Sequence, residues 1–441
     1  MQAEIDRLNH TVQALGSTVQ ALEARLRAVE GTPPSVMSIA PPPAEPQGSP
    51  APALIAAPTA QAPAVPPPPA PQPHADSPLK LYGFVQFDAI QDFGRVDPDW
   101  EDTLRATRIP TRDGQYGGDG KFIGSIRQSR VGLEGGSGDF HLKLEADLFG
   151  VGDDQGKVTP RLRQAYGQYG QWLAGQTNTL FMDVDVFPNT IDYWGPAGQV
   201  FLRNPQVRWT PLAGANSFAI AIEDASSDID TGRFGRQFPE FGAQAEGRDE
   251  LPDLSAQFRM SRDWGHFQAS GIVRRVAFET ADTPGNRPNG EDTGWGLALS
   301  GHLKFDQKDR LVLSAVGGEG IASYMNDGGN DLVPSDTRPG EIPRATAMPL
   351  WAGLVYYDRW WNERWSSSIG YSFTQVDNSN NQDAGAFKKG EYASINLLHY
   401  PSANTMVGGE FLWGQRTDND GATGDDTRLQ VSFKYLFPGQ P

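Results

Sequence analysis

The chain has 441 residues, with 54 acidic and 37 basic side chains for a formal net charge of -17, and it has no cysteine. The lack of cysteine excludes disulfides and thiolate metal sites, and the negative charge argues against a nucleic-acid partner. No run approaches eighteen apolar residues, so we expect no membrane-spanning helix, although barrel strands would escape such a search. Because the chain opens on a polar heptad segment, we expect a mature form without its signal peptide.

Residues 1–30 carry the apolar repeat of an α-helical coiled coil. Positions a and d of four successive heptads are Ile5, Leu8, Val12, Leu15, Val19, Leu22, Leu26 and Val29. β-Branched residues at a with leucine at d favour a dimer. The last heptad instead matches a trimerisation pattern, in which Arg25 pairs with Glu30 of the next helix over a core of Leu26 and Val29. Both oligomeric states therefore stay open from the heptads alone.

Residues 31–78 form a segment too rich in proline and alanine to fold. Seventeen of these residues are proline, including the run 66–69. Such a composition cannot bury a core and predicts an extended, semi-rigid linker. A ligand for a proline-binding domain is the alternative interpretation of this segment.

Residues 79–441 alternate between apolar and polar side chains, which is the period of a half-buried strand. In the segment 140–148, for example, Leu142 and Leu144 share one face while Lys143 and Glu145 share the other. About sixteen such strands are expected, at 79–93, 121–135, 138–149, 160–170, 172–181, 204–211, 216–224, 251–262, 264–278, 293–305, 309–318, 348–358, 363–377, 386–398, 403–416 and 427–437.

The connections between these segments alternate in length, with seven short turns and eight long loops. That alternation is typical of an outer-membrane barrel with short periplasmic turns and both chain ends on the periplasmic side. Aromatic residues also crowd one short turn, as expected of a girdle at a membrane interface: Tyr356, Tyr357, Trp360, Trp361 and Trp365. A soluble β-sandwich or propeller would show neither feature. We therefore predict an all-β membrane barrel of about sixteen antiparallel strands behind an N-terminal coiled coil.

Catalytic motifs are lacking in the sequence. The six histidines are scattered, and there is no phosphate-binding glycine loop, no metal-binding histidine pair and no nucleophile elbow. We therefore expect no enzyme activity, no cofactor and no metal site.

The lumen of a sixteen-stranded barrel holds water and needs a constriction to become selective. The connection 183–202 is long and rich in aromatic and proline residues, so we expect it to fold into the lumen. An ordinary outer loop is the alternative. The residues of this connection that we expect to form the constriction are Asp185, Asp192, Tyr193 and Trp194.

Charges are sorted by position, with acidic residues in the long loops and arginines in the strands. An arginine facing lipid near the midplane would cost about 2–4 kcal/mol, so the strand arginines should face the lumen, where they would favour anions. The candidates for lining the pore are Arg127, Arg130, Arg161, Arg163, Arg203, Arg208 and Arg274. Alternatively, these arginines pair with lumen carboxylates such as Glu145 and Asp147 and only brace the wall.

Several motifs resemble the DcaP-like family of trimeric outer-membrane porins, which is related to general Gram-negative porins. The motifs are 81–85 (LYGFV), 129–135 (SRVGLEG), 161–167 (RLRQAYG), 173–177 (LAGQT) and 180–183 (LFMD). The resemblance covers essentially the whole chain and is strongest over 79–210. It implies a trimeric channel with a periplasmic coiled coil that takes up small organic anions, such as dicarboxylates or aromatic acids.

Together these patterns predict a coiled coil at 1–30, a linker at 31–78 and a barrel at 79–441. We expect a homotrimeric porin of the Gram-negative outer membrane, in contact with lipid and lipopolysaccharide, with small organic anions as its solutes. The alternative is a non-selective porin whose coil serves as a structural spacer in the envelope.

Overall fold

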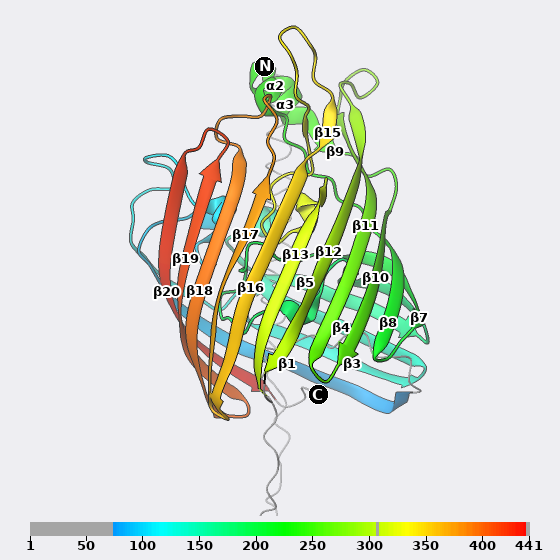
Figure 1. Cartoon of the computed structure of the whole chain (residues 1–441), viewed down its shortest axis with the longest axis vertical. Coiled ribbons are helices and arrows are strands. Elements are labelled where there is room, and N and C mark those ends of the chain that lie inside the picture. The colour runs from blue at the N-terminus through cyan, green and yellow to red at the C-terminus, as the bar shows by residue number, and fades with distance from the viewer. Residues whose placement is uncertain (1–73, 306–307, 438–441) are drawn as a thin grey trace, which may run out of the picture. The chain divides into compact units, whose positions relative to one another are not determined.

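The computed structural model describes residues 74–305 and 308–437, and these residues form an antiparallel β-barrel (Figure 1). The predicted coiled coil lies outside the described residues, as do its trimerisation residues Arg25, Leu26, Val29 and Glu30 and nearly all of the linker. Among the described residues, no helix has the length and apolar character needed to cross a bilayer.

Sixteen strands make up the barrel wall, as predicted. In chain order they are β1 (His74–Asp92), β2 (Lys121–Ser125) continued by β3 (Arg130–Gly138), β4 (Phe140–Phe149), β5 (Val158–Tyr169), β6 (Trp172–Asn178), β7 (Arg203–Leu212), β8 (Asn216–Glu223), β10 (Asp253–Arg262), β11 (Gly265–Thr280), β12 (Gly290–Phe305), β13 (Asp309–Glu319), β16 (Pro349–Asn362), β17 (Trp365–Val376), β18 (Phe387–Ser402), β19 (Thr405–Asp418) and β20 (Thr423–Phe437). The short strand β9 (Ala245–Gly247) adds to the edge of β11. The ring closes where β1 pairs with β20, from Gly83 opposite Phe437 to Asp92 opposite Arg428.

Alternate residues of the strands face opposite sides of the wall, and the two faces differ in polarity. On β12, the apolar side chains of Leu297 and Leu299 are 50% and 43% exposed, whereas the neighbouring Ser300 is buried. On β4, Leu144 is exposed, whereas Glu145 and Asp147 are buried toward the interior. An outer apolar band and a polar interior are what a barrel in a bilayer requires.

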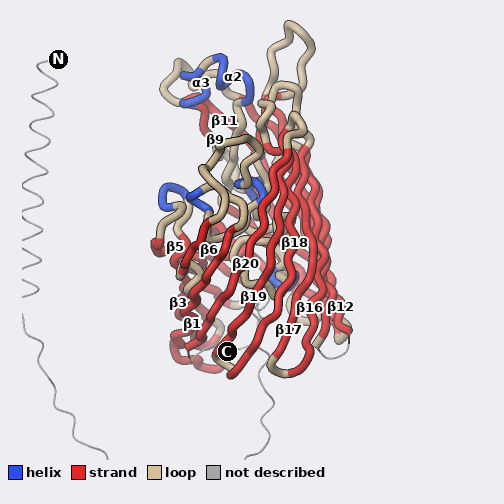
Figure 2. The backbone as a smooth tube through the Cα atoms, turned by 90° about the vertical axis from the view of Figure 1, so that its left-hand side faces the viewer, coloured by secondary structure: helices blue, strands red, loops and turns tan. Residues whose placement is uncertain are grey.

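The two ends of the barrel differ in the length of their connections (Figures 1 and 2). At one end the strands are joined by short turns. The other end bears long loops, in which lie α2 (Gly232–Gln237), α3 (Pro239–Gln244), β14 (Leu332–Pro334) and β15 (Ala345–Ala347), together with the 3-10 turns η1 (Pro98–Trp100), η2 (Ala106–Arg108), η3 (Gly152–Asp154), η4 (Val184–Val186) and η5 (Ala322–Tyr324). By the usual orientation of such barrels, the short turns are periplasmic and the long loops extracellular.

The structure differs from the sequence prediction at some boundaries. The first strand begins at His74, five positions before the predicted start and inside the predicted linker. The segment predicted as one strand at 121–135 is broken at 126–129, where Ser129 N donates to Ile126 O in a turn. Arg127 lies in this break and pairs with Asp102 of a long loop, a tertiary contact that no local pattern predicts.

The expected aromatic girdle is only partly correct. Trp361 and Trp365 are exposed on the outer face, but Tyr356 is fully buried and bonds Ser394 in the interior, 3.2 Å away. Trp360 lines an interior cavity. Neighbouring strand residues point to opposite faces, so a run of adjacent aromatic residues cannot all reach lipid.

The assignment of the outer face can be tested by introducing a charge. We expect Leu299→Arg on β12 to lower the unfolding free energy by about 2–4 kcal/mol, because it would place a guanidinium in lipid near mid-strand. Urea unfolding of the barrel in lipid vesicles would measure the loss. The matched control is Leu251→Arg in a long loop, where the leucine is also exposed, and that variant should keep wild-type stability.

Candidate functional site

The long connection between β6 and β7, residues 179–202, lies inside the barrel, and we call it the lumen loop. Its backbone N–H groups at Ile191 and Asp192 donate to the carboxylate of Glu410 on β19, at 3.1 and 2.9 Å. The side chain of Asn189 donates to Ser366 on β17 and Tyr400 on β18. These strands lie across the ring from β6 and β7, so the loop crosses the lumen.

Asp192 fixes the middle of the lumen loop. Its carboxylate accepts bonds from Thr103 Oγ1 at 2.9 Å, Tyr392 OH at 3.1 Å and the backbone N–H groups of Leu104 and Gly195. Burial raises the pKa of Asp192 above its ordinary value, although these bonds act in the opposite direction. The loop is therefore joined both to the barrel wall and to the first long loop.

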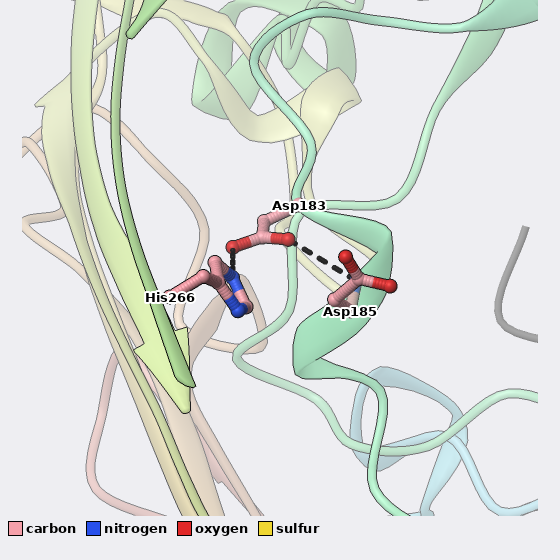
Figure 3. Close-up of side chains that lie close together, drawn as sticks. All are labelled: Asp183, Asp185 and His266. Atoms are coloured by element: carbon pink, nitrogen blue, oxygen red, sulfur yellow. Dashed lines mark hydrogen bonds and ion pairs between the residues drawn. The ribbon is translucent and has the colours of Figure 1, made fainter. Parts of the chain in front are cut away.

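The start of the lumen loop is anchored by a cluster of charged side chains (Figure 3). Asp183 Oδ2 lies 2.7 Å from His266 Nε2 and accepts a bond from Ser300 Oγ at 2.7 Å. Arg259 pairs with both Asp183 and Asp185. Asp183, Asp185 and His266 are close enough together to be ligands for a cation. The guanidinium of Arg259 already supplies positive charge to both carboxylates, so the arrangement favours an anchor over a metal centre.

The Asp183 anchor should make stability depend on pH. Burial opposes ionisation of Asp183, but His266, Arg259 and Ser300 prevail and hold its pKa below the ordinary value of 3.8. A lowered pKa stabilises the folded state above the unfolded pKa, and this stabilisation is lost as pH falls through the folded pKa. We expect Asp183→Asn to be less stable than wild type at neutral pH and to lose less stability below about pH 4.

Thermal denaturation followed by circular dichroism across this pH range would measure the effect of Asp183→Asn. The exposed loop residue Asp153 provides the control, since Asp153→Asn should reproduce the wild-type pH profile. Parallel pH profiles for wild type and Asp183→Asn would contradict the anchoring role.

Two buried carboxylates on β4 organise arginines beside the lumen loop. Asp147 Oδ2 lies 2.6 Å from Arg161 Nη2 and 2.9 Å from Arg163 Nη1. Glu145 Oε1 lies 2.7 Å from Arg163 Nε. The hydroxyl of Tyr193, from the lumen loop, donates to Asp147 at 2.5 Å and accepts from both arginines. The loop and the wall therefore share one network.

Two further arginines complete this group. Arg130 Nη1 is 3.6 Å from Glu145, and Arg203 at the start of β7 lies over the ring of Phe201, 4.5 Å from its centre. Among the described residues, Arg203 has no carboxylate within ion-pair distance. We call Arg130, Arg161, Arg163, Arg203, Glu145 and Asp147 the arginine cluster. With four guanidinium groups and two carboxylates, it carries an excess of positive charge.

Two interior cavities lie on either side of this cluster. The outer cavity, of about 1050 Å³, includes Arg105, Arg161 and residues of the long loops. The inner cavity, of about 460 Å³, includes Arg130, Arg163 and residues near the short turns. Phe201 and Arg203 line both cavities, which places Arg203 where the two cavities adjoin.

The seven arginines predicted to line the pore divide into two groups. Arg130, Arg161, Arg163 and Arg203 line the two cavities. The other three line neither cavity and are buried. Arg127 pairs with Asp102 at 2.5 Å, Arg208 donates to the backbone oxygen of Asn178 at 2.6 Å, and Arg274 pairs with Asp253 and Asp331, both at 3.2 Å.

The four residues expected at the constriction all belong to the lumen loop, with Asp185 and Asp192 engaged in anchors and Tyr193 in the arginine cluster. Trp194 donates from Nε1 to the backbone oxygen of Asn326 at 2.7 Å. Its ring and that of Trp100 lie 4.7 and 4.2 Å from the guanidinium of Arg105. This places aromatic surface beside a cation in the outer cavity.

Sequence reasoning missed several cations that line the cavities. Arg105 and Arg108 lie in the first long loop, between β1 and β2. A loop has no alternating pattern that would indicate which way a side chain points. Lys304 and Lys434 line the inner cavity and lie on strand faces whose polar alternation was visible in the sequence. Applying the alternation rule to lysine as well as arginine would have found them.

Comparison with known proteins gives a match over most of the chain. The family model described as DcaP outer membrane protein matches residues 70–437. No curated protein matches the chain. The solved structure of the outer membrane channel DcaP of Acinetobacter baumannii is similar at 24% identity with a TM-score of 0.68, over 82% of this chain and 98% of that one. An anion-selective porin from Comamonas acidovorans shares 12% identity with a TM-score of 0.51, over 82% and 100%. These two likenesses concern the fold.

Proposed function

Since the chain belongs to the DcaP outer membrane protein family and is an outer-membrane channel rather than an enzyme, we propose that it admits small organic anions in preference to cations. The observation that carries this proposal is the position of Arg203. This arginine lines both cavities and has no carboxylate partner among the described residues. A permeating carboxylate can therefore accept a charge-assisted bond there without displacing an internal ion pair.

The charges along the rest of the route support the same preference. Six arginines and three aspartates line the outer cavity. Four arginines, three lysines and four aspartates line the inner one. In the described part of the chain, no ion pair joins Lys304, Lys308 or Lys434 to a carboxylate. An excess of one sign in a narrow route with low-dielectric walls raises the local concentration of the opposite ion. The net charge of the whole chain is therefore a poor guide to the selectivity of its pore.

The proposed solutes are dicarboxylates and aromatic acids. Guanidinium groups bind carboxylates through two parallel hydrogen bonds. Trp194 is half-buried and provides aromatic surface in the outer cavity, beside the guanidinium of Arg105. The lining thus combines the two kinds of contact that an aromatic carboxylate uses.

A non-selective porin is the second candidate, and one observation favours it. Arg130, Arg161 and Arg163 all lie within ion-pair distance of Glu145 or Asp147, so part of the cluster serves to brace the wall. In that case selectivity would follow solute size alone, and the coiled coil would act as a spacer in the envelope.

Swelling of proteoliposomes in a series of solutes would separate these candidates. The series would contain dicarboxylates, aromatic acids and neutral sugars of matched size. We expect the acids to permeate faster than the sugars of equal size. Equal rates at equal size would refute the proposed preference and support the non-selective porin.

We also propose that the channel is a homotrimer in contact with lipid and lipopolysaccharide, with a periplasmic coiled coil at 1–30 joined by the linker at 31–78. The trimerisation pattern of Arg25, Leu26, Val29 and Glu30 supports this arrangement. Chemical cross-linking in intact membranes would test this arrangement. We expect a cross-linked product of three chains, and a largest product of two chains would contradict the proposal.

A further inference from the structure

A third cavity, of about 460 Å³, lies among the long loops and has a different lining from the channel. Its walls come from α2 and α3, the end of β11, the connection that follows β11, and β14 with β15 and the loop between them. Figure 1 places α2, α3, β15 and the end of β11 together at the long-loop end of the barrel. Four phenylalanines from these walls face the cavity: Phe234, Phe238, Phe241 and Phe278. We propose that this cavity binds an amphipathic carboxylate, with an apolar or aromatic body and one anionic head.

The body of the cavity suits an apolar ligand. Phe278 is buried and meets Phe241 edge to face at 6.3 Å between ring centres, which forms a firm inner wall. Near the surface, Phe238 is 53% exposed and Ile342 is 86% exposed. Large apolar side chains gathered around a hollow, in a loop region beyond the lipid, mark a ligand or partner site.

The charges at the cavity favour an anionic head. Arg287 and Arg344 line it, both are exposed, and neither pairs with a carboxylate among the described residues. Asp230 is the only acidic lining residue, and its two carboxylate oxygens accept bonds from Gly232 N and Gln382 Nε2, both at 2.8 Å. Two unpaired guanidinium groups therefore lie beside an apolar hollow, the arrangement that an amphipathic carboxylate complements.

The threonine hydroxyl groups that line the cavity already have hydrogen-bond partners within the protein, so they do not require a more polar ligand. The hydroxyl of Thr280 donates to Pro288 O at 2.6 Å, and that of Thr283 lies 2.8 Å from the backbone oxygens of Thr280 and Arg287. A hydrophilic dicarboxylate would leave the phenyl rings uncovered. The site therefore selects against the small hydrophilic solutes proposed for the channel.

The cavity can be tested separately from the channel, since Asp230 is the only residue that lines both it and the outer cavity. Calorimetric titration of the full chain in lipid nanodiscs with 4-phenylbutyrate would measure binding. We expect saturable binding, weakened about tenfold by Arg344→Gln through the loss of a charge-assisted bond. The uncharged amide of the probe should bind about tenfold more weakly for the same reason.

Three comparison variants make the result decisive. Arg233→Gln on α2 removes an exposed arginine that lines none of the three cavities described above, and it should bind the probe like wild type. Phe238→Ser changes an exposed wall residue, so it should weaken binding without unfolding the loop. Arg203→Gln alters the channel and should leave binding unchanged. Weakening by Arg203→Gln with no effect of Arg344→Gln would place the probe in the channel and overturn the proposal, as would the absence of saturable binding.

Discussion

Replacing Arg203 with glutamine or glutamate should weaken the anion preference of the channel. The side chain lines both cavities and has no carboxylate partner among the described residues, so its charge acts directly on a passing ion. A unit charge about 4 Å from an ion contributes about 1 kcal/mol in a water-like medium, equivalent to a factor of about five. We expect Arg203→Gln to lower the anion-to-cation permeability ratio by at least about fivefold, and Arg203→Glu to lower it further.

Reversal potentials in planar bilayers would measure these ratios. Arg262→Gln is the matched control, because Arg262 is an exposed arginine on β10 that lines neither interior cavity. That variant should keep the wild-type ratio. Equal ratios for wild type, Arg203→Gln and Arg203→Glu would show that Arg203 does not set selectivity.

Replacing Glu410 with alanine should loosen the middle of the lumen loop and increase the single-channel conductance. The Glu410 carboxylate accepts from the N–H groups of Ile191 and Asp192 and from Asn396 Nδ2, at 3.1, 2.9 and 2.8 Å. All of these groups are buried, and each donor left without an acceptor costs about 1–3 kcal/mol. A loop that loses this anchor should leave the lumen wider and its conductance noisier.

Single-channel recording would detect the release, and heat-modified migration on gels would confirm that the barrel still forms. Glu410→Gln is the milder comparison, since it retains one acceptor oxygen and should fall between wild type and Glu410→Ala. An intact Glu410→Ala barrel with wild-type conductance would contradict the anchoring of the loop at β19.

The strands could be predicted because the surroundings of a barrel impose their pattern. Lipid outside and water inside require alternate residues to differ in polarity. The face to which each side chain of the segment 140–148 points could therefore be predicted from the sequence. The break at 126–129 was not readable, because it depends on Arg127 meeting Asp102 from a distant loop. The same alternation also misled where it was not applied strictly, as when Tyr356 was assigned to the lipid face.

The candidate site was predictable to a lesser degree. The alternation of apolar and polar residues correctly predicted that Arg130 and Arg163 face the interior, where they line a cavity. It predicted the same direction for Arg274, but that side chain is paired with Asp253 and Asp331 and lines neither channel cavity. Whether an inward-facing arginine contacts solvent or a carboxylate depends on how the long loops pack. Loop sequences lack the alternating pattern of strands, so this packing cannot be predicted from them. For the same reason, the contacts of Arg105 in the outer cavity could be found only in the structure.

We expect the interior of this acidic protein to favour anions. The zero-current potential of the wild-type channel, in a planar bilayer that separates two concentrations of potassium chloride, tests this claim most directly. The proposal predicts the sign that results when chloride crosses faster than potassium, because positive side chains outnumber negative ones along both cavities. A potential of the opposite sign, or no potential, would contradict it.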